Sequence, residues 1–207
     1  MTSSEKLGAH VAQTFGFDGE IVRVELRDGA VLLAIQIDPT EHARRSKAGL
    51  GAITDRQVIT SLWELPNGIE LGYEDVPDWV KEATDRAPKG VLTRRQGILG
   101  RTVQPPLRVR GALAIGRSFD AVLRRVGQVS ALAPTAVIMR RPVEEDEPGL
   151  LNARLYGVGV AQEEGGVARA LLYPGPVAPT LGPYSWWVAE MAYEALDASV
   201  SGDSPKP

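Results

Sequence analysis

The stretch EIVRVELRDGAVLLAIQI, residues 20–37, places two runs of strand-forming residues on either side of Asp28-Gly29. In the first run Val22, Val24 and Leu26 alternate with charged residues, which is the period of a strand with one buried face. Glycine takes the positive φ of a tight hairpin turn without steric cost. The stretch therefore predicts a β-hairpin.

Four further segments carry strand signals. Hairpins are predicted over 58–73, about the turn Pro66-Asn67-Gly68, and over 153–173, about Gly165-Gly166. Single strands are predicted over 107–115 and over the apolar stretch 135–139.

Five helices are expected between and after these strands. The signals are a capping residue or a proline at the start, apolar residues at helical spacing, or both. They begin near Ser3, Thr40, Pro77, Ser118 and Tyr184. The mixture predicts the α+β class: an antiparallel or mixed β-sheet built from hairpins, with a few helices packed on one side of it. We expect a single domain over 1–198 and a disordered C-terminal tail over 199–207.

The composition narrows the chemistry that the chain can perform. It has no cysteine, which excludes disulfides, thiol nucleophiles and thiolate zinc sites, and its two histidines leave few candidate bases. No nucleophile elbow and no complete dinucleotide-binding motif occurs, since Gly157-Val-Gly159 lacks the third glycine. We expect no metal and no cofactor. The N-terminus has no secretory pattern and no apolar run is long enough to span a membrane, which predicts a cytoplasmic protein.

The charges are divided unevenly along the chain. Residues 81–141 carry 13 Lys or Arg against 3 Asp or Glu, while the flanking segments are acidic. Such a segment either meets an anionic partner or is neutralised by the acidic flanks. The irregular stretch 91–110, interrupted by glycines and by Pro105-Pro106, is the expected functional loop. The residues predicted to bind an anion or nucleic acid are Arg94, Arg95, Arg101, Arg108, Arg110, Arg124 and Arg125.

The C-terminal helix has a wider apolar face than one core contact needs. Aromatic residues dominate the energetics of many protein interfaces, and adjacent helix residues point about 100° apart. Tyr184, Trp186 and Trp187 are therefore the predicted partner-binding residues, with packing on the sheet as the alternative.

The missing catalytic motifs and the opposed charge blocks favour a non-catalytic interaction protein, or an accessory subunit of a larger assembly, whose partner is another protein chain. The alternative is a nucleic-acid- or phosphate-binding protein that uses the basic segment 81–141. A hydrolase is the least favoured of the three.

Overall fold

The computed structural model describes residues 3–201, which form both helices and sheets and belong to the α+β class, as predicted. Contacts group the described chain into two compact units. Unit 1 holds the residues up to Gln36 and Val109–Thr180, and unit 2 holds Ile37–Arg108 and the residues from Leu181 on. The elements are α1 Ser3–Thr14, β1 Glu20–Leu26, β2 Gly29–Ile37, α2 Pro39–Ala48, α3 Arg56–Glu64, β3 Glu70–Gly72, the 3-10 helix η1 Tyr73–Asp75, α4 Asp78–Asp85, β4 Leu92–Arg95, β5 Ile98–Arg101, β6 Leu107–Gly116, α5 Phe119–Gly127, β7 Thr135–Met139, α6 Pro148–Leu155, β8 Gly159–Glu164, β9 Val167–Leu172 and α7 Pro183–Ser201.

Unit 1 is built on a mixed sheet with the strand order β1-β2-β6-β7-β8-β9. The predicted hairpin over 20–37 is confirmed as β1 and β2, which pair in antiparallel register with Leu26 opposite Gly29. The hairpin of β8 and β9 is antiparallel too and turns at Gly165-Gly166. Between these edge hairpins, β6, β7 and β8 run parallel, with α5 and α6 as their crossover connections. The mixed sheet is thus confirmed, although its centre is parallel and not made of hairpins.

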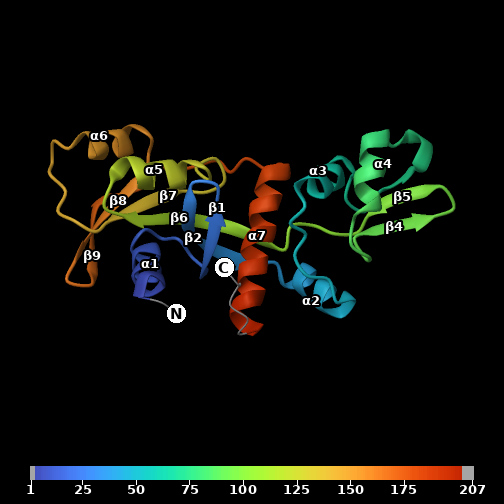
Figure 1. Cartoon of the computed structure of the whole chain (residues 1–207), viewed down its shortest axis with the longest axis horizontal. Coiled ribbons are helices and arrows are strands. Elements are labelled where there is room, and N and C mark those ends of the chain that lie inside the picture. The colour runs from blue at the N-terminus through green and yellow to red at the C-terminus, as the bar shows by residue number, and fades with distance from the viewer. Residues whose placement is uncertain (1–2, 202–207) are drawn as a thin grey trace. The chain divides into compact units, whose positions relative to one another are not determined.

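Helices cover both faces of this sheet, which corrects the expectation of a one-sided arrangement. Figure 1 shows α1 on one side of the strands and α5 and α6 on the other. Leu113 and Ile138 pack in the core beneath α1, whereas their neighbours Ala114 and Met139 pack in the core beneath α5 and α6. Buried parallel strands are apolar on both faces for this reason.

Unit 2 contains a small antiparallel sheet of strand order β3-β5-β4. Its core forms where Leu65, Val76, Val80 and Leu99 pack together, so that α4 covers the strands. Helix α3 packs against both α4 and α7. The helix predicted after Pro77 is confirmed as α4.

The first half of the hairpin predicted over 58–73 is wrong, because that segment forms α3. The Asp55 carboxylate caps this helix by accepting hydrogen bonds from the amides of Gln57 at 2.8 Å and Val58 at 3.2 Å. The β-branched run that suggested a strand is tolerated in the helix because Val58, Ile59 and Leu62 are buried. Of the predicted hairpin, only the second strand is present, as β3.

The stretch 91–110, predicted to be irregular, is regular over much of its length. It contains the hairpin of β4 and β5, whose turn residues Gln96 and Gly97 have φ of 36° and 79°. Two successive positive φ values suit a tight hairpin turn. Of the two glycines that suggested a loop, Gly97 therefore lies in a turn between two strands and Gly100 lies within β5.

Helix α6 was not predicted. The acidic run before it ends at Pro148, which begins the helix because the amide that proline lacks would be unpaired there anyway. At the C-terminus, α7 continues to Ser201, three residues into the predicted tail, and 202–207 lie outside the described residues. No helix in 3–201 combines the length and apolarity that a membrane crossing requires.

Candidate functional site

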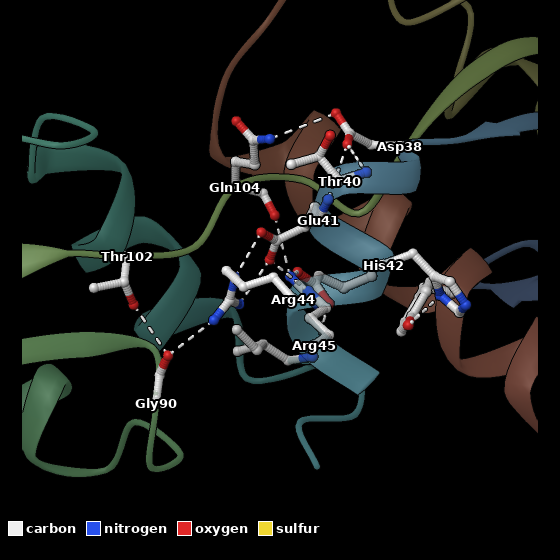
Figure 2. Close-up of polar contacts among 12 residues, drawn as sticks. Asp38, Thr40, Glu41, His42, Arg44, Arg45, Gly90, Thr102 and Gln104 are labelled. Carbon is white, nitrogen blue, oxygen red and sulfur yellow. Dashed lines mark hydrogen bonds and ion pairs between the residues drawn. The ribbon is translucent and has the colours of Figure 1, made fainter. Parts of the chain in front are cut away.

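A buried ion network joins α2 to α7 in unit 2. The Arg45 guanidinium has no exposed surface and lies between two carboxylates that are equally buried, Glu41 from its own helix and Glu190 from α7. Figure 2 shows the α2 side of this network. Burying three ionisable groups is unfavourable unless each is paired, so the hydrogen bonds of the network determine whether it is compatible with a stable fold.

All five N–H groups of Arg45 have acceptors. The Nε atom donates to Glu41 at 2.7 Å, Nη1 donates to Glu190 at 2.7 Å and to the Gly51 carbonyl at 3.3 Å, and Nη2 donates to Glu190 at 2.6 Å and to the Gln104 carbonyl at 3.1 Å. Five is the full donor capacity of a guanidinium group. Arg45 therefore has no donor left for a ligand.

The two carboxylates also accept hydrogen bonds from groups other than Arg45. Besides Arg45, Glu190 accepts from the Trp186 indole at 2.7 Å and from the Ile53 amide at 2.8 Å, and Glu41 accepts from Arg44 at 2.8 Å. Burial by itself raises the pKa of Glu41, but the hydrogen bonds from Arg44 and Arg45 outweigh it and hold that pKa below its ordinary value. Burial by itself lowers the pKa of Arg45, and the bonds to Glu190 reverse this, so the pKa is raised. These shifts favour the ionised forms of Glu41 and Arg45, and the hydrogen bonds of the network join α2, α7 and two loops.

The predicted partner-binding aromatics differ widely in exposure. Trp186 is fully buried in the network, and Trp187 is 9% exposed and donates its indole N–H to the Thr54 carbonyl at 3.1 Å. Tyr184 is 41% exposed, with its ring centroid 5.8 Å from that of Trp187. Of the three, only Tyr184 offers a partner substantial surface in this conformation.

A groove between α3 and α4 begins beside these aromatics. The Arg56 guanidinium lies 3.7 Å from the ring centroid of Trp187 and also lines the groove, a hollow of 360 Å³. Across it lie Trp79 of α4, which is 50% exposed, and Arg86, the residue after α4, which donates to Gln57 of α3 at 2.6 Å. The buried Ser61 hydroxyl also lines the groove and has no hydrogen-bond partner among the described residues. Arginine and tryptophan around a hollow are typical of an interface hot spot.

Four of the predicted anion-binding arginines belong to unit 2, and one of these is engaged in an ion pair. Arg94 donates to the Asp85 carboxylate at 2.8 Å and to the Thr84 carbonyl at 2.7 Å. Arg95 and Arg108 are exposed. Arg101 is half-buried, donates to the Leu62 carbonyl at 3.1 Å and lies 5.0 Å from the Trp186 ring, and its burial lowers its pKa.

The other three predicted arginines, Arg110, Arg124 and Arg125, belong to unit 1 and do not form one cluster. Arg110 lines a hollow with Phe15 and several prolines, while Arg124 is exposed on α5. Arg125 lines a different pocket of 340 Å³, together with Arg23, Arg117 and Arg140. The sequence therefore predicted one member of an arginine-lined pocket and missed the other three. Arg23 lies outside the basic segment, whereas Arg117 and Arg140 lie within it but were not selected as site residues.

The groove residues of unit 2 were also missed. Residues 58–64 were assigned to a strand and α3 was not predicted, so Arg56 and Ser61 were not placed on a helix face opposite α4. One signal in the sequence could have predicted α3. Asp55 is a capping residue, and it precedes Val58, Ile59 and Leu62, which are apolar and lie at helical spacing.

Within 3–201, no group of three or more His, Cys, Asp or Glu side chains is arranged to hold a metal ion. Comparison with protein-family models, with curated proteins and with solved structures finds no match to this chain.

Proposed function

We propose that this chain is a non-catalytic interaction protein, an accessory subunit of a larger assembly, which binds an acidic segment of a partner protein in the groove between α3 and α4. The observation that carries the proposal is the pair of groove arginines, Arg56 and Arg86, which lie beside the half-exposed Trp79. We expect the protein to act in the cytoplasm.

The charge of the groove favours an acidic occupant. Arg56 and Arg86 contribute two positive charges and Glu82 one negative charge, and neither arginine forms an ion pair with a carboxylate of residues 3–201. Arg56 is held in place by stacking on Trp187, so less conformational entropy is lost when it binds a carboxylate. Complementary charge of this kind steers association and selects the partner.

The remaining groove residues favour a protein segment over a free anion. The exposed Trp79 ring offers an apolar surface on which a side chain of the partner can pack. Tyr184, one of the predicted partner-binding residues, contacts Trp187, which in turn stacks on Arg56, so Tyr184 extends the groove surface.

Selection of random peptides displayed on phage against the whole protein tests the proposal. We expect the selected peptides to be acidic and to contain an apolar residue, and their binding, followed by fluorescence polarisation, to fall about tenfold or more in Arg86→Met and in Trp79→Ala. Arg95→Met is the matched control, because it removes an exposed arginine of unit 2 outside the groove.

Peptides that are basic or neutral, or that bind Trp79→Ala and Arg86→Met as tightly as the unsubstituted protein, would refute the proposal. Trp186→Ala is unsuitable for this test because Trp186 is buried and bonded to Glu190, so its removal is expected to destabilise unit 2.

A further inference from the structure

The arginine-lined pocket of unit 1 shares no residue with the groove of the proposed function. We propose that this pocket binds the phosphate group of a small phosphorylated molecule. Its basic lining comes from Arg23 on β1, Arg117 after β6, Arg125 on α5 and Arg140 after β7.

The parallel register of β6 and β7 brings two of these arginines together. Gly116 is paired with Met139 at the ends of the two strands, and the next residue of each is Arg117 or Arg140. The carboxyl ends of parallel strands are where open α/β sheets bind their ligands. Arg125 is held at the same place by a hydrogen bond of 3.4 Å from its Nη1 to the Ile115 carbonyl.

The four guanidinium groups are not equally free to bind a ligand. Arg23 donates to Glu25 at 2.6 Å, and Arg140 donates to Glu163 at 2.9 Å and to the Ser4 hydroxyl at 3.1 Å. By contrast, the side chain of Arg117 makes no ion pair or hydrogen bond to a described residue. Among the described residues, the guanidinium of Arg125 donates only to the Ile115 carbonyl. Arg117 and Arg125 therefore supply the donors, with Arg23 and Arg140 adding positive charge.

The guanidinium fork matches the paired oxygens of a phosphate group, and two such forks satisfy several of its oxygens at once. The pocket is also lined by the partly exposed apolar residues Ala30 and Ile115, which suit the rest of an organic phosphate. Its 340 Å³ is within the range of small-molecule sites.

The carboxylates near the pocket argue against a nucleic-acid strand. Glu5 lines the pocket, and Glu25 and Glu163 pair with two of its arginines. A single phosphate group can bind the arginines that remain, whereas the successive phosphates of a strand would meet these negative charges. The pocket is therefore assigned to a small ligand.

Titration of the whole protein with phenyl phosphate and with inorganic phosphate, followed by calorimetry, tests the assignment. We expect saturable binding of phenyl phosphate that weakens with added salt, and no binding of the uncharged phenol. Arg125→Met and Arg117→Met should each weaken binding by about tenfold or more, since each removes charge-assisted hydrogen bonds. Arg124→Met, which changes the adjacent exposed residue of α5, should bind normally.

The assignment is overturned if neither phosphate compound binds at millimolar concentration, or if Arg117→Met and Arg125→Met both bind as Arg124→Met does. Tighter binding of a single-stranded oligonucleotide than of phenyl phosphate, lost in the same variants, would overturn the small-molecule assignment as well. Should Arg125→Met fail to fold, Arg117→Met still decides the outcome, because its side chain holds no described structural contact. Trp79→Ala and Arg86→Met should leave phosphate binding unchanged, which separates this test from that of the α3–α4 groove.

Discussion

Replacing Glu190 with leucine is expected to destabilise unit 2 severely. The change removes the carboxylate that accepts two hydrogen bonds from Arg45, one from the Trp186 indole and one from the Ile53 amide. Four donors then lie inside the protein without their acceptor, and the Arg45 charge loses one of its two buried partners.

The magnitude follows from these lost contacts. Each buried donor left unsatisfied costs about 1–3 kcal/mol of stability. The total loss for the four donors is smaller than the sum of these values, because neighbouring residues relax and water enters. Removing one partner of a buried ion pair costs about 3–5 kcal/mol in proteins generally. We therefore expect Glu190→Leu to lower the free energy of unfolding by about 3–5 kcal/mol, a large share of the roughly 5–15 kcal/mol typical of a domain.

Urea unfolding followed by tryptophan fluorescence is a suitable assay, because all four tryptophans, Trp63, Trp79, Trp186 and Trp187, belong to unit 2. Asp85→Ala is the control, since it breaks the surface ion pair with Arg94 and should cost no more than about 1 kcal/mol.

A double-mutant cycle completes the test. Arg45→Met alone should cost about as much as Glu190→Leu, and the double variant should cost clearly less than the sum, because neither charge is then left without its partner. Additive losses, or a loss below about 1 kcal/mol for Glu190→Leu, would refute the argument that the saturated network holds unit 2 together.

Two further predictions concern pH and backbone strain. Because the pKa of Glu41 is lowered, the native state binds fewer protons than the unfolded state near the ordinary value of 4.5, so the free energy of unfolding should fall as the pH drops from 4.5 through the native pKa. In urea titrations over that pH range, Glu41→Gln should lose less stability per pH unit than the unsubstituted protein. An unchanged slope would contradict the argument. Gly19→Ala should lower the free energy of unfolding of unit 1 by about 3 kcal/mol or more, because φ is +127° and the new Cβ would lie 2.1 Å from the Ile35 carbonyl oxygen. Gly165→Ala, at φ of +61° in open space, should lower it by about 1 kcal/mol. Thermal unfolding followed by circular dichroism compares the two variants, and equal losses would count against the steric explanation.

Local signals in the sequence were sufficient wherever neighbouring residues decide the conformation. The alternation of Val22, Val24 and Leu26 and the glycine at position 29 predicted the first hairpin, and the apolar run over 135–139 predicted β7. The same local signals misled at Val58 and Ile59, because β-branched residues suit a strand as well as a buried helix face, and packing against α4 and α7 favours the helix.

The sequence by itself determined the α+β class, the edge hairpins and the absence of thiol chemistry, since these depend on periodicity, turn residues and composition. Glu41 and Arg45 are also a visible helical pair, but Glu190, which completes their network, is 145 residues from Arg45. The tertiary structure alone decided that Trp186 is buried, that Arg56 faces α4, and that Arg23 joins Arg117, Arg125 and Arg140 at one pocket. The physical reason is that burial and charge pairing depend on which distant segments pack together, and sequence position does not specify that.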